Sequence, residues 1–84
     1  MQQYLIMCRS LTYAQRASRL LESSGITATL ARAPQALSGN GCGYSVIVSF
    51  KRGPRAVSIL KDADLLQGRV YIKNEDGGLK EAEL

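Results

Sequence analysis

The segment "YSVIVSF", residues 44–50, has the strict alternation of a half-buried β-strand. One face carries the larger side chains Tyr44, Val46, Val48 and Phe50, and the other carries Ile47 between two serines. Side chains alternate between the faces of a sheet, so one face of this strand can be buried while the other stays polar. The segment therefore predicts a strand with its aromatic and valine face on the core.

A strand and a helix precede this segment, and a helix and a strand follow it. The run "YLIMC", residues 4–8, predicts a first strand, and Thr12 with Gln15 forms a capping box that predicts a helix ending at Gly25. "ITATLA", residues 26–31, predicts the second strand, and "PQALS", residues 34–38, is compatible with one helical turn. Downstream we expect a helix from Pro54 to Gly68 and a strand "RVYIK" at residues 69–73.

The resulting order, β-α-β-β-α-β, predicts an α+β protein of the ferredoxin-like, split βαβ type. Its four-stranded antiparallel sheet would carry both helices on one face. We expect residues 1–74 to form this single domain and residues 75–84, with four acids and one lysine, to form an acidic C-terminal tail. Leu5, Met7 and Ile47 would lie on the sheet face without helices, where a homodimer partner could cover them.

The composition narrows the function classes. The chain has 84 residues, 45% of them hydrophobic, which suits one small core, and no apolar run approaches the length of a membrane span. We find no secretion signal pattern, so we expect a cytoplasmic protein. With no histidine and two cysteines, the sequence argues against triad catalysis, a zinc site or another metal or cofactor. The net charge is +4, but no RNA-binding signature accompanies it, so nucleic acid is not a favoured partner.

Cys42 stands out because it sits among glycines in "SGNGCG", residues 38–43. In the expected topology this connection lies at the same end of the sheet as the start of the first helix. That end would also gather three arginines, which would favour a thiolate: Arg9, Arg32 and Arg69. Gly41 and Gly43 leave their backbone N–H groups open to bind an anion, and Ser38 belongs to the same turn. The alternative is a hairpin loop that needs glycine and tolerates an inert cysteine.

Cys8 ends the apolar run "YLIMC". A cysteine in such a run most often packs as a small hydrophobe. Because the first and third strands are expected to be neighbours, Cys8 could instead act as a resolving thiol for Cys42.

Three segments together resemble the small selenium/sulfur carrier-like proteins: "YLIMCRSLTYAQRASRLLESSGI", "TLARAPQALS" and "CGYSVIV", which span residues 4–48. By position, Cys42 and Gly43 match the Cys-Gly of that family, Pro34 its proline and Ser38 its serine. Gln35 replaces an arginine that often follows the proline, and Arg32 could supply that charge.

The resemblance implies a carrier more than an enzyme. Cys42 would accept sulfur or selenium from a donor protein as a persulfide-type adduct and pass it to an acceptor protein. The alternative function is a protein-interaction or oligomerisation module of the same fold, in which Cys42 is structural.

Overall fold

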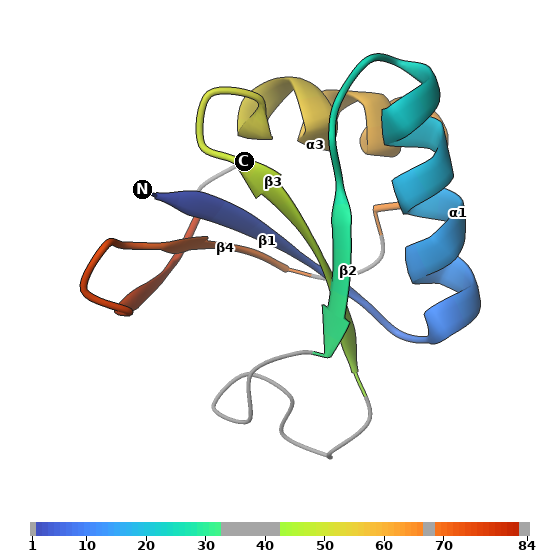
Figure 1. The fold of residues 1–84 in the computed structure, drawn as a ribbon. Coiled ribbons are helices and arrows are strands. Elements are labelled where there is room, and N and C mark those ends of the chain that lie inside the picture. Colours follow the sequence, from blue (N-terminus) through green and yellow to red (C-terminus); the bar gives the residue numbers. More distant parts are fainter. Residues whose placement is uncertain (1, 33–42, 67–68, 83–84) are drawn as a thin grey trace.

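A computed structural model of the protein describes residues 2–32, 43–66 and 69–82 (Figure 1). Along the chain the elements are β1 (Gln3–Cys8), α1 (Leu11–Ser23), β2 (Thr29–Arg32), β3 (Tyr44–Ser49), α3 (Gly53–Asp62), β4 (Val70–Lys73) and β5 (Leu79–Glu81). None of the helices in these ranges is long and apolar enough to cross a membrane. The expected helical turn at residues 34–38 lies outside the described residues.

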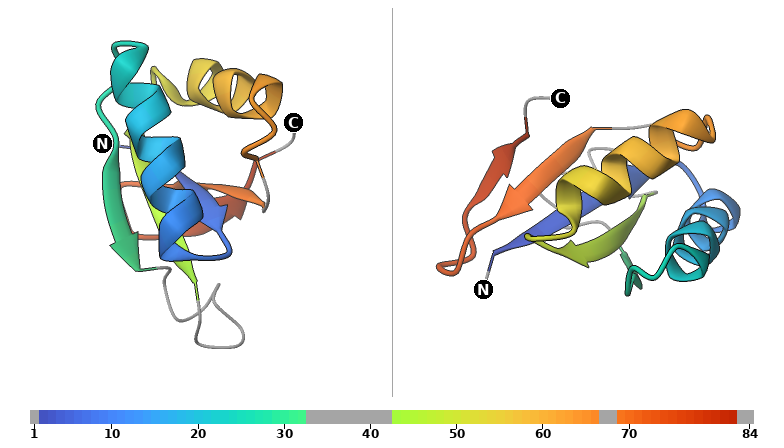
Figure 2. Two further views of the ribbon diagram at one scale, coloured as in Figure 1. Left: turned by 90° about the vertical axis from the view of Figure 1, so that its right-hand side faces the viewer. Right: turned by 90° about the horizontal axis from the view of Figure 1, so that it is seen from above.

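The strands form one antiparallel sheet in the order β2-β3-β1-β4-β5. β1 is central and pairs with β3 along its whole length, from Gln3↔Ser49 to Cys8↔Tyr44. Both helices pack on one face of this sheet and against each other (Figure 2). The structure is therefore an α+β fold with two helices over an antiparallel sheet.

The expectation of four strands is wrong, because β5 adds a fifth at the edge of the sheet beside β4. The turn at residues 74–78 sends the chain back along β4. Gly77 adopts φ +88°, which glycine takes without steric cost, and the Asp76 carboxylate accepts a 2.8 Å hydrogen bond from the Gly78 N–H. A 2.8 Å hydrogen bond from the Asn74 N–H to the Gly78 carbonyl closes the turn. Part of the expected tail therefore belongs to the sheet.

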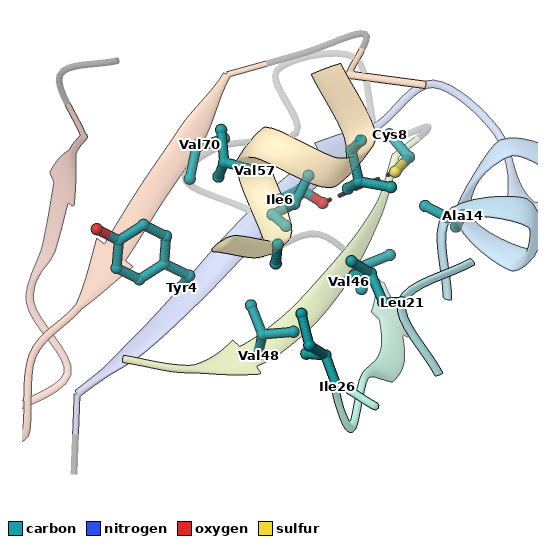
Figure 3. Close-up of a cluster of buried hydrophobic side chains, with 13 residues drawn as sticks. Tyr4, Ile6, Cys8, Ala14, Leu21, Ile26, Val46, Val48, Val57 and Val70 are labelled. Carbon is teal, nitrogen blue, oxygen red and sulfur yellow. Dashed lines mark hydrogen bonds between the residues drawn. The ribbon is translucent and has the colours of Figure 1, made fainter. Parts of the chain in front are cut away.

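The hydrophobic core lies between the helices and the sheet (Figure 3). The predicted alternation of β3 holds, because Val46 and Val48 are fully buried in this core and Tyr44 packs against it. The strands contribute Tyr4, Ile6, Cys8, Val46, Val48 and Val70, and the helices contribute Ala14, Ala17, Leu21, Ala56, Val57 and Leu60. Phe50 follows β3 and remains 42% exposed, with its ring centroid 5.6 Å from that of Tyr4.

The opposite face of the sheet carries a second row of side chains. The register places Ile47, Leu5 and Tyr71 side by side across three neighbouring strands. Thr29 and Glu81 complete this row at its two edges. Directly opposed residues share a sheet face, so Leu5, Met7 and Ile47 lie away from the helices, as predicted.

Helix α1 has Ser10 as its N-cap, not the predicted Thr12. Its C-terminus agrees with the sequence, because Gly25 adopts φ +84° directly after the C-cap Ser24. Hydrogen bonds from Gly25 N–H to the Glu22 carbonyl (3.0 Å) and from Ile26 N–H to the Leu21 carbonyl (2.9 Å) form a Schellman motif. Ile26 is thereby held in the core rather than in β2, which begins three residues later than expected.

Helix α3 is shorter than predicted, because it ends at Asp62 and does not continue toward Gly68. Asp64 adopts φ +58°, a left-handed conformation that aspartate tolerates better than most residues. The N–H of Asp64 donates to the Lys61 carbonyl at 3.1 Å, and that of Leu65 donates to the Leu60 carbonyl at 2.8 Å. The same Schellman pattern thus closes both helices, once with glycine and once with aspartate.

Candidate functional site

One end of the sheet gathers the segments that the sequence associates with Cys42. The end of β1, the start of α1, the end of β2 and the start of β3 all lie there (Figure 1). Cys42, Gly41 and Ser38 themselves lie outside the described residues. Gly43, which follows Cys42 in the sequence, directly precedes β3 and is half-buried.

The N-terminus of α1 contributes positive electrostatic potential to this end. The Ser10 hydroxyl oxygen accepts a hydrogen bond from the Tyr13 N–H at 3.4 Å, and the first turn contains no acidic residue. The partial positive charge of a helix N-terminus is therefore not offset by a carboxylate of that turn. Such a terminus stabilises a nearby anion, and a thiolate or persulfide is an anion.

Arg9 and Arg32 approach this end from β1 and β2. Both side chains are exposed, and neither forms an ion pair with a carboxylate of the described part of the chain. Arg32 stands directly opposite Tyr44, which in turn stands opposite Cys8, so the three residues form a row on the helix-covered face. These two arginines are available to a negatively charged group.

Arg69 lies at the same end as Arg9 and Arg32 but, unlike them, forms an ion pair among the described residues. Its backbone carbonyl accepts a 3.0 Å hydrogen bond from the Met7 N–H, which fixes the start of β4 beside β1. Its guanidinium lies 3.3 Å from the Glu81 carboxylate, so part of its charge is already matched. The sequence offered no sign of this pair, because Glu81 was expected in a tail outside the sheet.

Cys8 is a core residue at the end of β1, only 6% exposed (Figure 3). Its S–H donates a long hydrogen bond of 3.8 Å to the Ile6 carbonyl. Burial raises the pKa of the Cys8 thiol from 9.0 to about 11, because the thiolate would lose its hydration there. At neutral pH Cys8 is therefore a protonated thiol, and a resolving reaction would first require its exposure.

The structure thus brings Arg9, Arg32 and Arg69 to one end of the sheet, together with Gly43 and the start of α1. They do not converge on one point, because β3 and β1 separate Arg32 on β2 from Arg69 beside β4, and none of them is a general base. Across residues 2–32, 43–66 and 69–82, no three cysteine, aspartate or glutamate side chains converge as metal ligands would. The chemistry open to these groups is the stabilisation of an anion.

Comparison with known proteins gives one result. A family model described as "Putative Se/S carrier protein-like" matches residues 3–72. No curated protein and no solved structure matches the chain significantly. The family match covers β1 through most of β4, and its range includes residue 42. The chain belongs to the Se/S carrier protein-like family.

Proposed function

We propose that this protein carries sulfur or selenium covalently on Cys42. In the loading step the Cys42 thiolate attacks the terminal sulfur of a donor persulfide. A new S–S bond forms at Cys42, the S–S bond of the donor breaks, and the donor leaves as a thiolate. An acceptor thiolate removes the terminal sulfur by the same exchange, and a selenium atom would travel in the same position.

The observation that carries this proposal is the family match over residues 3–72. The electrostatics at the end of the sheet next to Gly43 are consistent with it. Arg9 and Arg32 lack ion-pair partners in the described ranges, and the first turn of α1 lacks an acid. Positive charge around a thiol increases its thiolate fraction and stabilises a bound persulfide.

The contrast between the two cysteines supports the assignment to Cys42. With its pKa at about 11, Cys8 would be thiolate in only about one molecule in ten thousand at pH 7. Its burial also hinders the approach of a donor protein. Reaction with a donor is therefore expected at Cys42, with Gly41, Gly43 and Ser38 shaping the loop around it.

We further infer that the fold is the ferredoxin-like arrangement extended by one edge strand. The order β2-β3-β1-β4, with one helix between β1 and β2 and another between β3 and β4, supports this inference. In this arrangement the β2-β3 connection and the start of α1 belong to the same end of the sheet.

The proposal is tested by the rate of alkylation at each cysteine. Iodoacetamide labelling between about pH 5 and 10, followed by peptide mass spectrometry, should show Cys42 at least about tenfold faster than Cys8 at pH 7. The Arg9→Gln and Arg32→Gln variants should slow Cys42 near pH 7, whereas Arg16→Gln, on the exposed surface of α1, should not. A Cys42 rate equal to that of a short cysteine peptide at every pH would contradict the proposal.

The alternative function is an interaction or oligomerisation module that uses the sheet face opposite the helices. Met7, Ile47 and Tyr71 are half-buried on that face, and each is large enough to contribute to an interface. Under this alternative Ile47→Asp abolishes association in analytical ultracentrifugation and Cys42→Ser leaves it intact. Under the carrier proposal Cys42→Ser abolishes transfer in a protein that remains folded.

A further inference from the structure

A cavity of about 340 Å³ lies at the other end of the sheet from Gly43. It lies beside the end of β3, beyond the residues that pair with β2. The pairing of these strands begins at Thr29↔Ile47, so Val48 and Ser49 have no partner in β2. The polar lining consists of two glutamines, three hydroxyl residues and one arginine: Gln2, Gln3, Thr27, Thr29, Ser49 and Arg52.

The described residues give this cavity a positive charge. Arg52 is the only charged residue among those that line it, and none of them carries a carboxylate. Glu75 and Asp76 line a separate hollow that shares only Gln2 with the cavity. Hydroxyl and amide groups around a single guanidinium offer hydrogen-bond donors to a carboxylate or another oxyanion.

The turn beside the cavity adds more positive charge and an apolar side chain. Lys51, Arg52 and Arg55 are exposed, and none of them pairs with an acid of the described chain. The first turn of α3 contains no acidic residue, and the Arg52 side chain makes no capping hydrogen bond there. Phe50 is 42% exposed next to these cations.

We propose that this end of the sheet is a docking surface for an acidic segment of a protein partner. One carboxylate of the segment enters the cavity beside Arg52. Further acidic side chains meet Lys51 and Arg55, and an apolar side chain packs on Phe50. This proposal does not depend on the chemistry of Cys42, although a partner docked here would leave the end near Gly43 accessible.

The spread of the cations favours a peptide over a small anion. Lys51 and Arg55 do not line the cavity, so an anion bound inside it would meet Arg52 alone. Lys51 precedes α3 and Arg55 lies in its first turn, so the two cations flank Arg52 along the chain. A single-stranded nucleic acid is disfavoured because successive bases stack on several aromatic rings, and Phe50 is the only exposed aromatic residue among the described residues.

The test is a titration of the ¹⁵N-labelled protein with peptides, in which binding is monitored through the amide signals of its NMR spectrum. The probe is the peptide acetyl-Glu-Asp-Leu-Glu-Asp-amide. The comparison probes are its Gln/Asn counterpart, inorganic phosphate and a thymidine pentanucleotide. The acidic peptide should shift the amide signals of Thr27, Thr29 and Ser49, and the Gln/Asn peptide should not.

Variants locate the charge dependence. Arg52→Gln should weaken binding of the acidic peptide about two- to fivefold. The double variant Lys51→Gln/Arg55→Gln, which removes two charges, should weaken binding more than Arg52→Gln does. Arg16→Gln removes an exposed arginine from α1 and should leave the dissociation constant unchanged.

Three results would overturn the proposal. The first is equal binding of the acidic and Gln/Asn peptides, or no binding of either. The second is an equal loss of affinity in Arg16→Gln and Arg52→Gln. The third is phosphate or the pentanucleotide binding as tightly as the acidic peptide, which would make this a small-anion or nucleic-acid site.

Discussion

Alkaline pH should destabilise the protein through Cys8. Burial holds the pKa of this thiol at about 11 in the folded protein, against 9.0 for an exposed thiol. Between these two values the unfolded chain releases the thiol proton and the folded chain keeps it. The folded state then binds more protons, so the free energy of unfolding falls as the pH rises.

The size of this effect follows from the two pKa values. The difference between 9.0 and about 11, at 1.36 kcal/mol for each pH unit, corresponds to about 2.7 kcal/mol. Below pH 9 this stability is fully present, and above about pH 11 it is lost. A loss of this size is a large fraction of the stability of a small domain.

Urea unfolding at a series of pH values measures the effect. The comparison pairs the Cys42→Ser variant with the double variant Cys42→Ser/Cys8→Ala. Both lack the Cys42 thiol and contain the same tyrosines and lysines, so they differ only in the Cys8 thiol. The difference in unfolding free energy between the two should change by about 2.7 kcal/mol from about pH 8 to about pH 11.5. Parallel pH profiles for the two variants would refute the assignment of Cys8 as a buried, protonated thiol.

Two further predictions concern positions that set the fold, both measured by urea unfolding at neutral pH. Ser10→Ala should lower the free energy of unfolding by about 1 kcal/mol because it removes the N-cap of α1, and Thr12→Ala should lower it less. A larger loss in Thr12→Ala would indicate that Thr12 is the N-cap. Gly53→Ala should cost about 1–3 kcal/mol, because a Cβ at this position would overlap the ring of Tyr4. Ser58→Ala on the exposed side of α3 is the matched control, and equal stability of the two variants would contradict the close approach.

The sequence predicts the parts of this fold that depend on regular burial. The alternation in "YSVIVSF" and the apolar run "YLIMC" correctly locate β3 and the central strand β1. Gly25 correctly marks the end of α1, because the left-handed conformation there favours glycine.

The misplaced boundaries have physical causes. Asp64 takes the same left-handed position after α3, and an aspartate gives no strong signal for it. β5 has only one apolar residue, Leu79, because an edge strand is held mainly by backbone hydrogen bonds and by its turn. Periodicity cannot reveal either feature.

The candidate site was also predictable only in part. Topology alone correctly places Arg9, Arg32 and Arg69 at one end of the sheet, because it fixes which strand ends meet. The pairing of Arg69 with Glu81 depends on β5 and could not be foreseen. That Cys42 uses these arginines stays a prediction.

Transfer of a sulfur atom to Cys42 tests the central claim most directly. The protein is incubated with glutathione persulfide near pH 7, digested and analysed by mass spectrometry. The peptide acetyl-Gly-Cys-Gly-amide, which reproduces residues 41–43, serves as the reference thiol. Cys42 should gain an adduct of about 32 Da, the mass of one sulfur atom, at least about tenfold faster than the reference peptide. The Cys8→Ala variant should behave like the natural protein, Cys42→Ser should gain no adduct, and an added thiol should remove the sulfur. An adduct that forms no faster than on the reference peptide, or that forms on Cys8, would contradict the carrier function.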